Sequence, residues 1–319
     1  MHIVLSHALP DGPNCKALLG RPEFPPLPRL QQVFSRLARS AVLHGAASDL
    51  TPLHERLAYP LLPAADGLLP LGALAAHAAG QDTTLAWGLL TLCHLAPQSD
   101  HVAMDEPEEL DLTPQESGAL MQAMRSYFLE DGLALHAHGP GQWLVCGEPL
   151  RDLPTASLER VRGQPVDAWM PQGARARHLR RLHNEMQMLL YSHPVNDVRA
   201  AHGRMPVNAF WISGTGSLPS AAAPQTPARA LHTELHTALR KSALRDDAWD
   251  WAQAWQALDA TQGPRWLELA RNATDWSITL CGATQAHRYT AQTSALRGWL
   301  ARMRQGWSPT SFSERLHSA

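Results

Sequence analysis

The stretch from His193 to Gly216, HPVNDVRAAHGRMPVNAFWISGTG, carries most of the information about the fold. Pro194 ends the preceding helix, and the two side chains that follow, Asn196 and Arg199, are able to bind a planar oxyanion. The run PVNAFWIS combines apolar, β-branched and aromatic residues, which predicts a buried strand. The GTGS at its end predicts a glycine turn at the carboxyl end of that strand, where open α/β sheets bind anions and substrates.

Two interpretations of this stretch stay open. In the first, Asn196, Arg199, Asn208, Gly214 and Gly216 hold an anionic or phosphorylated small molecule. The arginine would take the charge bidentately, the asparagines would orient it, and the glycines would let backbone N–H groups approach. In the second, the same residues form a structural junction, in which the polar side chains cap helix and strand ends and the glycines make a tight crossover.

The composition indicates two domains and no strong electrostatic field of either sign. A chain of 319 residues suits one large or two ordinary domains, and we predict two. The net charge of −2, from 27 basic and 29 acidic residues, favours neither nucleic acid nor an anionic membrane as a partner. One basic cluster is interpreted as a solvated helix face or, alternatively, as a phosphate-binding surface; it comprises Arg175, Arg177, Arg180 and Arg181, with His178 and His183 between them.

Cysteine usage and hydropathy indicate a cytoplasmic protein. The four cysteines contain no C-x-x-C pair and are predicted to be reduced packing residues (Cys15, Cys93, Cys146 and Cys281). The opening run MHIVLSHALPDG is too short for a signal peptide, and no apolar run approaches ~18 residues. We therefore expect a cytoplasmic location.

Hydrophobic periodicity predicts alternating strands and helices. Strands are expected at 2–9, 86–96, 100–107, 133–139, 142–148 and 275–283, the last of the chain. Helices are expected at 27–43, 113–132, 175–192, 231–242, 246–260, 265–273 and 294–307. The helix at 113–132 has Thr113 as N-cap, Glu116 three residues later and Gly132 as its stop. In WDWAQAW (249–255), Trp251 and Trp255 share a helix face, which is typical of a core or an interface.

The stretch that opens this section resembles a family signature. Its order of asparagine, arginine and glycine matches N-x-x-R-x-x-x-G-x-x-x-x-N-x(5)-G-x-G of the archaeal-type, cofactor-independent phosphoglycerate mutases of the alkaline-phosphatase superfamily. The helix RRLHNEMQMLLYSHPVN, the loop region QWLVCGEPLRDLPTASLERVRGQPVDAWMP and HERLAY (54–59) also look like parts of these enzymes. LHNEMQMLLYSHPVN and FWISGTGSLP are most similar to the proteobacterial regulatory proteins of the Rpf E type.

The resemblance implies an α/β fold, with an alkaline-phosphatase-like sheet flanked by helices and an inserted α+β domain. The core would comprise residues 1–75 and 205–319, and the inserted domain residues 76–204. It also implies a serine nucleophile and Asp and His ligands for two divalent metals. At the expected positions this chain has His7, Ala8 and Leu9 after the first strand, Leu50 in place of the serine, and Gly282–Ala283 in place of the closing D-H. We therefore expect a mutase-like fold without mutase chemistry.

Three hypotheses for function follow. The first is a degenerate mutase-like protein that serves as a regulatory or ligand-binding module, without cofactors. The second is an active metal-dependent mutase or phosphoryl-transfer enzyme, with Mn or Zn held by residues such as Asp11, His54, Asp246 and Asp275. The third is a structural interaction protein that uses its Trp-rich C-terminal helices, either as a homodimer or with a protein partner.

The histidines allow further metal hypotheses. His232 and His236, four apart with Glu234 between them, would share a helix face, although the alternative is a solvated amphipathic helix. Pairs at His136 and His138 and at His94 and His101 are interpreted as surface or packing residues. No G-x-S-x-G elbow is present, so hydrolase chemistry is not favoured.

Overall fold

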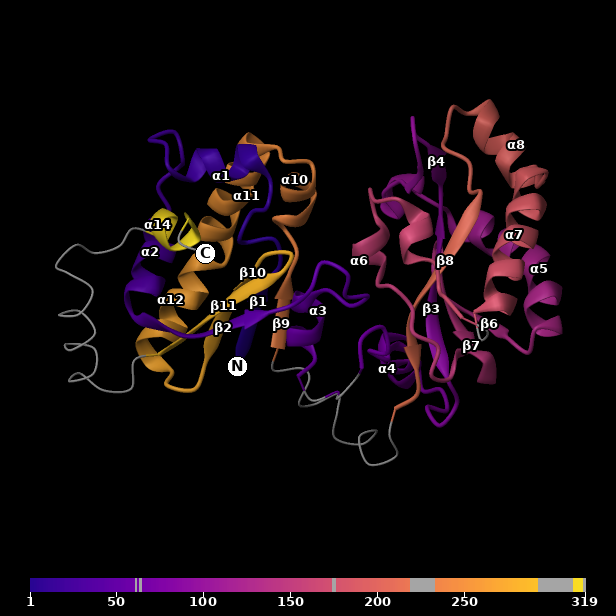
Figure 1. Ribbon diagram of the computed structural model, residues 1–319, viewed down its shortest axis with the longest axis horizontal. Coiled ribbons are helices and arrows are strands. Elements are labelled where there is room, and N and C mark those ends of the chain that lie inside the picture. Colours follow the sequence, from indigo (N-terminus) through magenta and orange to yellow (C-terminus); the bar gives the residue numbers. More distant parts are fainter. Residues whose placement is uncertain (61, 63–64, 174–175, 219–232, 292–311, 318–319) are drawn as a thin grey trace. The chain divides into compact units, whose positions relative to one another are not determined.

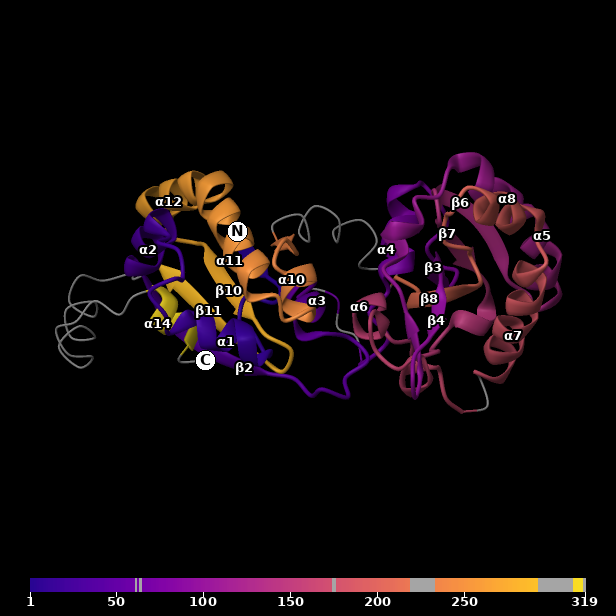
Figure 2. The ribbon, with the colours of Figure 1, turned by 90° about the horizontal axis from the view of Figure 1, so that it is seen from above.

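The computed structural model describes residues 1–60, 62, 65–173, 176–218, 233–291 and 312–317. The chain divides into two units (Figures 1 and 2). Unit 1 comprises Met1–Ser48, Leu53–Pro60 and Ala230–Ala319, and unit 2 comprises Asp49–Pro52 and Leu61–Arg229. The predicted fold class, an α/β core with an inserted domain, is confirmed. The insertion is longer at both ends than the predicted 76–204, because α4 and the strand at Ala209–Gly216 pack within unit 2.

Unit 1 contains a five-stranded mixed sheet in the order β2-β11-β10-β1-β9. Its strands are β1 (His2–Leu5), β2 (Leu37–His44), β9 (Thr233–His236), β10 (Ser277–Cys281) and β11 (Gln285–Ala291). The short strand β1 lies between β10 and β9 and parallel to both, while β10, β11 and β2 are joined by antiparallel pairing. The carboxyl ends of three parallel strands therefore meet at one edge of this sheet.

Alternation along β1 divides the core of unit 1 between the two faces of its sheet. Ile3 and Leu5 pack into a large cluster with the helices, whereas Val4 packs on the opposite face with Leu53 and Cys281. The helices are α1 (Pro13–Leu19), α2 (Pro28–Ser35), α3 (Leu53–Ala58), α10 (Arg240–Leu244), α11 (Ala248–Thr261), α12 (Gly263–Asn272) and α14 (Phe312–His317). Of these, α3 contacts β1, β9 and β11 on the Val4 face.

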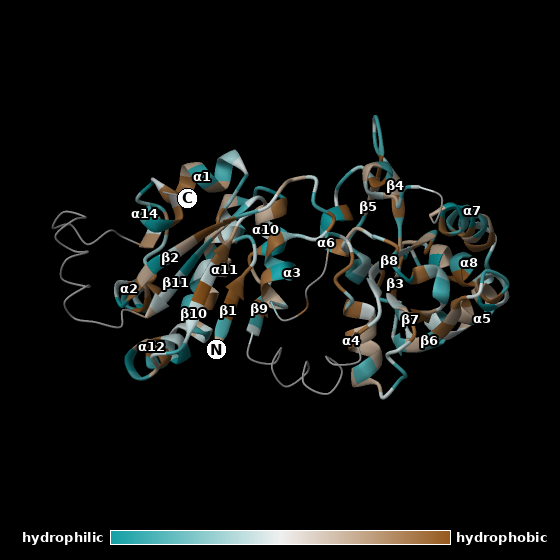
Figure 3. Cartoon of the chain, turned by 60° about the horizontal axis from the view of Figure 1, so that its bottom comes forward, coloured by the Kyte–Doolittle hydropathy of each residue, from teal (hydrophilic) through white to brown (hydrophobic). Residues whose placement is uncertain are grey.

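The Trp-rich segment belongs mainly to this core. Trp251 and Trp255 on α11 are fully buried and meet edge to face with ring centroids 6.0 Å apart. Figure 3 shows the hydrophobic colouring of β1 and α11. Asp247 caps α11 by accepting the Asp250 N–H. Trp249 is 63% exposed, so of the three tryptophans only this one lies on the surface of unit 1.

Unit 2 is built on a four-stranded antiparallel sheet in the order β6-β7-β3-β8. Its strands are β3 (Trp87–Cys93), β6 (Ala134–Gly139), β7 (Gln142–Cys146) and β8 (Ala209–Gly216), and β4 (Leu95–Pro97) pairs with β5 (Val102–Met104) beside it. One face is covered by α5 (Pro114–Glu130), α7 (Arg177–Tyr191) and α8 (Pro194–Ala201), and the other by α4 (Leu71–Ala78) and α6 (Leu158–Val161) (Figure 1). Short 3₁₀ helices lie at Pro107–Leu110, Glu148–Leu150 and Val166–Trp169.

Helix α5 forms as its sequence predicts. The Thr113 hydroxyl accepts the Glu116 N–H, and the Glu116 carboxylate accepts the Thr113 N–H, so both partners of the capping box are present. All four cysteines are buried and free, as predicted.

Four element predictions are wrong or untested. The helix expected at 27–43 ends at Ser35, because the following residues pair with β11 as strand β2. The helix expected at 231–242 is replaced by β9 and the short α10, and a further strand, β11, follows the one predicted to be last. In both predicted helices, strand pairing with distant residues outweighs local helical spacing. The helix expected at 294–307 lies outside the described residues. No helix among the described residues has the length and hydropathy needed to cross a membrane.

Candidate functional site

The carboxyl edge of the parallel strands in unit 1 is the place where sheets of this kind bind ligands. The loop that leaves β1 is fixed there by its backbone. The Ser6 N–H donates to the His236 carbonyl at 3.0 Å, and the Ala8 N–H donates to the Cys281 carbonyl at 2.7 Å. The buried Ser6 hydroxyl also donates to the His236 carbonyl, at 3.3 Å. This loop therefore joins all three parallel strands.

His7 adopts a left-handed backbone conformation at this edge, with φ of 54°. Its ring lies against the ring of His54 from α3, with centroids 5.4 Å apart and planes tilted by 54°. His54 is only 4% exposed. The sequence predicted His7 at the strand end, but it gave no signal for the contact between these two imidazoles, because it links residues from different elements.

Gly282 follows the end of β10 at the same edge, and the space where its Cβ would lie is filled. A Cβ built on Gly282 would lie 2.9 Å from the Leu9 carbonyl oxygen, a distance that real Cβ atoms essentially never show. Next to it, the Asp11 carboxylate accepts the Ala283 N–H at 3.1 Å. The position where the resemblance places a carboxylate thus has no room for a side chain.

The alternative set of metal ligands is dispersed through unit 1. Asp246 accepts the N–H groups of Asn14 and Cys15, both at 3.0 Å, so its carboxylate holds the start of α1. Hydrogen bonds from these groups hold the pKa of Asp246 below its usual range although burial opposes them. Asp275 accepts the N-terminal ammonium at its backbone carbonyl, at the amino end of β10 and thus at the opposite edge of the sheet.

Leu50, where the resemblance places the serine nucleophile, lies in a turn of unit 2 that is held by hydrogen bonds. The N–H groups of Leu50 and Thr51 donate to the two carboxylate oxygens of Asp66, at 2.8 and 2.9 Å. The buried Thr51 hydroxyl accepts the Gly67 N–H at 3.0 Å. Asp66 was not singled out from the sequence, where D-G at 66–67 indicates only a turn.

These residues do not fit a centre of two divalent cations. Throughout the described ranges there is no group of three or more His, Cys, Asp or Glu residues that could hold a metal ion. Near the loop after β1 the carboxylates of Asp11 and Asp246 are both bonded to backbone N–H groups, and the imidazoles of His7 and His54 are neutral donors, which leaves the charge of two cations uncompensated.

The predicted histidine pairs have separate roles. His236 lies on strand β9 rather than on a helix, and its ring contacts Trp266 with centroids 5.3 Å apart. Burial lowers the pKa of His236, although Glu234 opposes the shift. His94 bonds to the Pro206 carbonyl at 2.8 Å and His101 to Asp100 at 2.7 Å. His232 lies outside the described residues.

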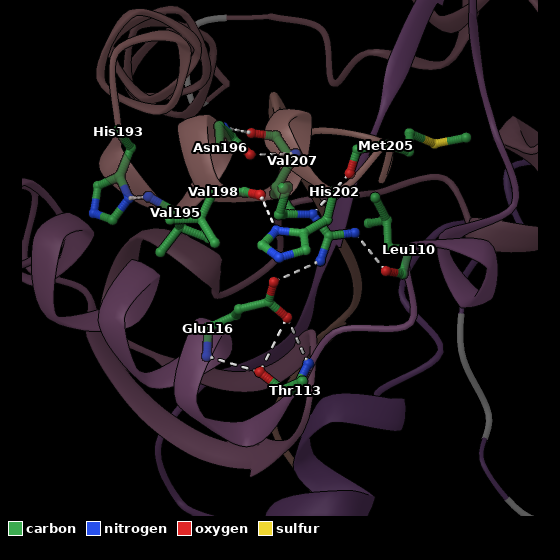
Figure 4. Close-up of polar contacts among 11 residues, drawn as sticks. Leu110, Thr113, Glu116, His193, Val195, Asn196, Val198, His202, Met205 and Val207 are labelled. Carbon is green, nitrogen blue, oxygen red and sulfur yellow. Dashed lines mark hydrogen bonds and ion pairs between the residues drawn. The ribbon is translucent and has the colours of Figure 1, made fainter.

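The five residues proposed to bind an anion all belong to unit 2, but Asn208 lies just before β8, Asn196 bonds to Val207 beside it, and the two glycines lie near the end of that strand. The polar side chains bind protein. The Asn196 amide donates to the Leu190 carbonyl at 2.7 Å. It also donates to the Val207 carbonyl at 2.7 Å and accepts the Val207 N–H at 2.8 Å (Figure 4). Asn196 thereby ties the end of α7 to the approach to β8. Asn208 makes a similar pair of bonds with the backbone of Leu95, at 2.7 and 2.9 Å.

Arg199 is 1% exposed and its guanidinium is used within unit 2. Nε donates to the Met205 carbonyl at 2.7 Å, one terminal nitrogen donates to Glu116 at 3.0 Å, and the other donates to the Leu110 carbonyl (Figure 4). Although burial would raise the pKa of Glu116, hydrogen bonds from Thr113 and Arg199 hold that pKa below its usual range. The arginine therefore joins α8, the start of α5 and the chain before it.

Gly214 and Gly216 leave room for Pro70 and Leu71 at the start of α4, and not for a ligand. The G-T-G predicted to be a turn is part of strand β8, which lies in an antiparallel sheet and so has no parallel-strand edge beside it. Gly214 has φ of +63°, and a Cβ there would lie 2.9 Å from the Cβ of Leu71 on α4. A Cβ on Gly216 would lie 3.2 Å from that of Pro70. Both contacts favour the structural interpretation of this stretch.

The basic cluster is partly described. Arg181 pairs with Asp131 and lies 3.5 Å from Glu185, and Arg180 donates to Gln172 at 3.4 Å. His183 is buried, which lowers its pKa, and its ring contacts Phe210. Arg175 lies outside the described residues. Arg181 is thus ion-paired and Arg180 is bonded to a neutral amide, which agrees with a solvated helix face.

No protein-family model matches the chain, and no curated protein matches its sequence. Among solved structures, the chain is similar to the cofactor-independent phosphoglycerate mutase from Thermoplasma acidophilum DSM 1728, with 14% identity and a TM-score of 0.38 over 92% of this chain and 90% of that one. It is also similar to the PH0037 protein from Pyrococcus horikoshii, with 14% identity and a TM-score of 0.42 over 92% of this chain and 88% of that one.

Proposed function

We propose that this chain is a phosphoglycerate-mutase-like protein without the metals and nucleophile of catalysis, and that it acts as a regulatory or ligand-binding module of the cytoplasm. The observation that carries the proposal is the packing at Gly282, where the Leu9 carbonyl takes the space that a metal-binding carboxylate would need. The resemblance to the regulatory proteins of the Rpf E type agrees with such a role.

Two further contacts support the loss of catalysis. At the expected nucleophile, Leu50 has no hydroxyl and the neighbouring Thr51 hydroxyl is buried and bonded to Gly67. A phosphoenzyme needs an accessible, activated hydroxyl, and neither residue supplies one. After β1, the chain presents Ser6 bonded to the His236 carbonyl and His7 packed on His54.

The other hypotheses have less support. An active Mn- or Zn-dependent enzyme would need Asp246 and Asp275 at one site, but they lie at different edges of unit 1 and Asp246 holds the start of α1. Of the tryptophans described in α11 and α12, only Trp249 is exposed enough for a contact surface, since Trp251, Trp255 and Trp266 are in the core.

The test is a coupled assay for isomerisation of 3-phosphoglycerate by the purified chain, with and without added Mn²⁺. An active cofactor-independent mutase in the same assay serves as positive control. The proposal predicts no turnover under either condition. Turnover that requires Mn²⁺ and disappears with a chelator would overturn it in favour of the enzyme hypothesis.

A further inference from the structure

A cavity of about 310 Å³ lies in unit 1, on the helix side of the carboxyl edge of β1 and β10. It is enclosed by the loop after β1, helix α1, the β10–β11 turn and α14. Its volume falls within the range of roughly 300–1,000 Å³ that is typical of small-molecule sites. It is separate from the stretch at 193–216, which lies in unit 2.

Part of the wall of this cavity is aliphatic. Leu9, Leu19 and Leu316 line it and are 4%, 5% and 2% exposed. They come from the loop after β1, from α1 and from α14, so three segments far apart in sequence supply one aliphatic surface. A ligand with a branched or linear apolar group of a few carbons would replace water against this surface.

The rim carries one charge of each sign. Asp11 and Lys16 both line the cavity. The Oδ2 of Asp11 accepts the Ala283 N–H, whereas its Oδ1 accepts none of the hydrogen bonds formed among the described residues. The Lys16 ammonium takes part in none of the ion pairs found in the described part of the chain. A carboxylate oxygen and an ammonium are thus both available to a ligand.

The backbone around the cavity is held in place before any ligand arrives. The N–H groups of Ala8 and Leu9 donate to the Cys281 carbonyl at 2.7 and 3.2 Å. The Gly282 N–H donates to the Gln285 carbonyl at 2.8 Å and closes the β10–β11 turn. The Asp11 carboxylate accepts the Ala283 N–H of the same turn. A preformed site loses less conformational freedom on binding.

We propose that this cavity binds a small zwitterion with an apolar side chain, of the α-amino-acid class. Asp11 accepts hydrogen bonds from the ligand ammonium, Lys16 pairs with the ligand carboxylate, and the three leucines hold the side chain. This site goes beyond the proposed loss of catalysis and does not depend on it, since the ligand would be held by charge pairing and apolar contact without a metal. Asp11 is shared with the metal hypothesis, but here it binds the ligand ammonium.

Calorimetry with the full chain tests the ligand class directly. L-Leucine is titrated beside leucinamide, which lacks the carboxylate, 4-methylpentanoate, which lacks the amine, and glycine, which lacks the apolar side chain. We expect saturable binding of leucine and affinity about tenfold weaker for each of the three analogues, as for the loss of one charge-assisted contact or of the apolar contact. Equal binding of leucine and 4-methylpentanoate, or no binding of leucine, would overturn the proposal.

Variants then locate the site. Lys16→Gln and Asp11→Asn should each weaken leucine binding about tenfold. Lys241→Gln, which alters an exposed lysine elsewhere in unit 1, should leave it unchanged. Asn at position 11 keeps an acceptor for the Ala283 N–H, and thermal unfolding of each variant checks that unit 1 stays folded. Unchanged affinity in a folded Lys16→Gln variant would place the binding elsewhere and contradict the assignment.

Discussion

Gly282 and Leu9 approach each other so closely that a Cβ on the glycine would lie 2.9 Å from the leucine carbonyl oxygen. This contact ties the end of β10 to the loop after β1, at the edge where a mutase would bind metal. This edge of the sheet is therefore packed backbone, and a side chain at Gly282 would meet the Leu9 carbonyl.

Gly282→Ala should lower the free energy of unfolding by about 1–3 kcal/mol, because the added methyl group meets backbone that cannot easily give way. The measurement is chemical denaturation of the full chain. The matched control is Gly20→Ala, where nothing lies within 4 Å and φ is −87°, so the change should be neutral or stabilise by about 0.4–1 kcal/mol. Equal stability of the two variants would contradict the close contact.

Arg199→Met should destabilise the chain by about 3–5 kcal/mol, because it removes the buried partner of Glu116 and the donors to two carbonyls. Arg204→Met, at an exposed position five residues later, should change stability by no more than about 0.5 kcal/mol. The contrary outcome has two parts: 3-phosphoglycerate raises the stability of the wild type, and Arg199→Met is as stable as the wild type but is no longer stabilised by 3-phosphoglycerate. That outcome would favour the anion-site interpretation.

Asn196→Asp should lower the free energy of unfolding, because the two carbonyls beside Asn196 need a hydrogen-bond donor. A carboxylate cannot donate to the Leu190 and Val207 carbonyls and would stand as a negative charge between them. We expect a loss of about 3 kcal/mol or more at neutral pH. Asn184→Asp, on the exposed face of α7, is the control and should be nearly silent. Similar denaturation curves for both variants would show that the amide is not needed there.

His2 predicts a pH dependence of stability. Burial, followed by the charges of Arg288 and the N-terminus, lowers the pKa of His2 from 6.5 to about 4. The unfolded chain therefore takes up the proton at a higher pH than the folded chain, so stability should fall as pH drops from about 6.5 to 4. His2→Gln should flatten this slope, and His178→Gln, at an exposed residue, should not. An unchanged slope in His2→Gln would exclude His2 as its source.

Local sequence signals predicted the elements that depend on local chemistry. The capping box of Thr113 and Glu116 predicted the start of α5. Strand β8 was visible as the apolar run before Gly214. These signals lie within a few residues of the structure they determine, so one sequence suffices to detect them.

Partners that are distant in the chain were not predictable in the same way. Thr233–His236 has helical spacing, but it becomes β9 because β1 pairs with it across more than two hundred residues. The commitment of Arg199 to Glu116 and of Asn196 to Val207 likewise depends on how α5, α7 and β8 meet. The sequence left the anion site and the junction equally open, and these contacts favour the junction.

The most direct test of the central claim is the metal content of the chain. Equilibrium dialysis against Mn²⁺ and Zn²⁺, followed by elemental analysis, measures how many cations each chain retains. A mutase-like protein that has lost its metal centre should retain far less than one equivalent of either ion. Retention of two equivalents of cation per chain, removable by a chelator, would contradict the claim and favour the hypothesis of a metal-dependent enzyme.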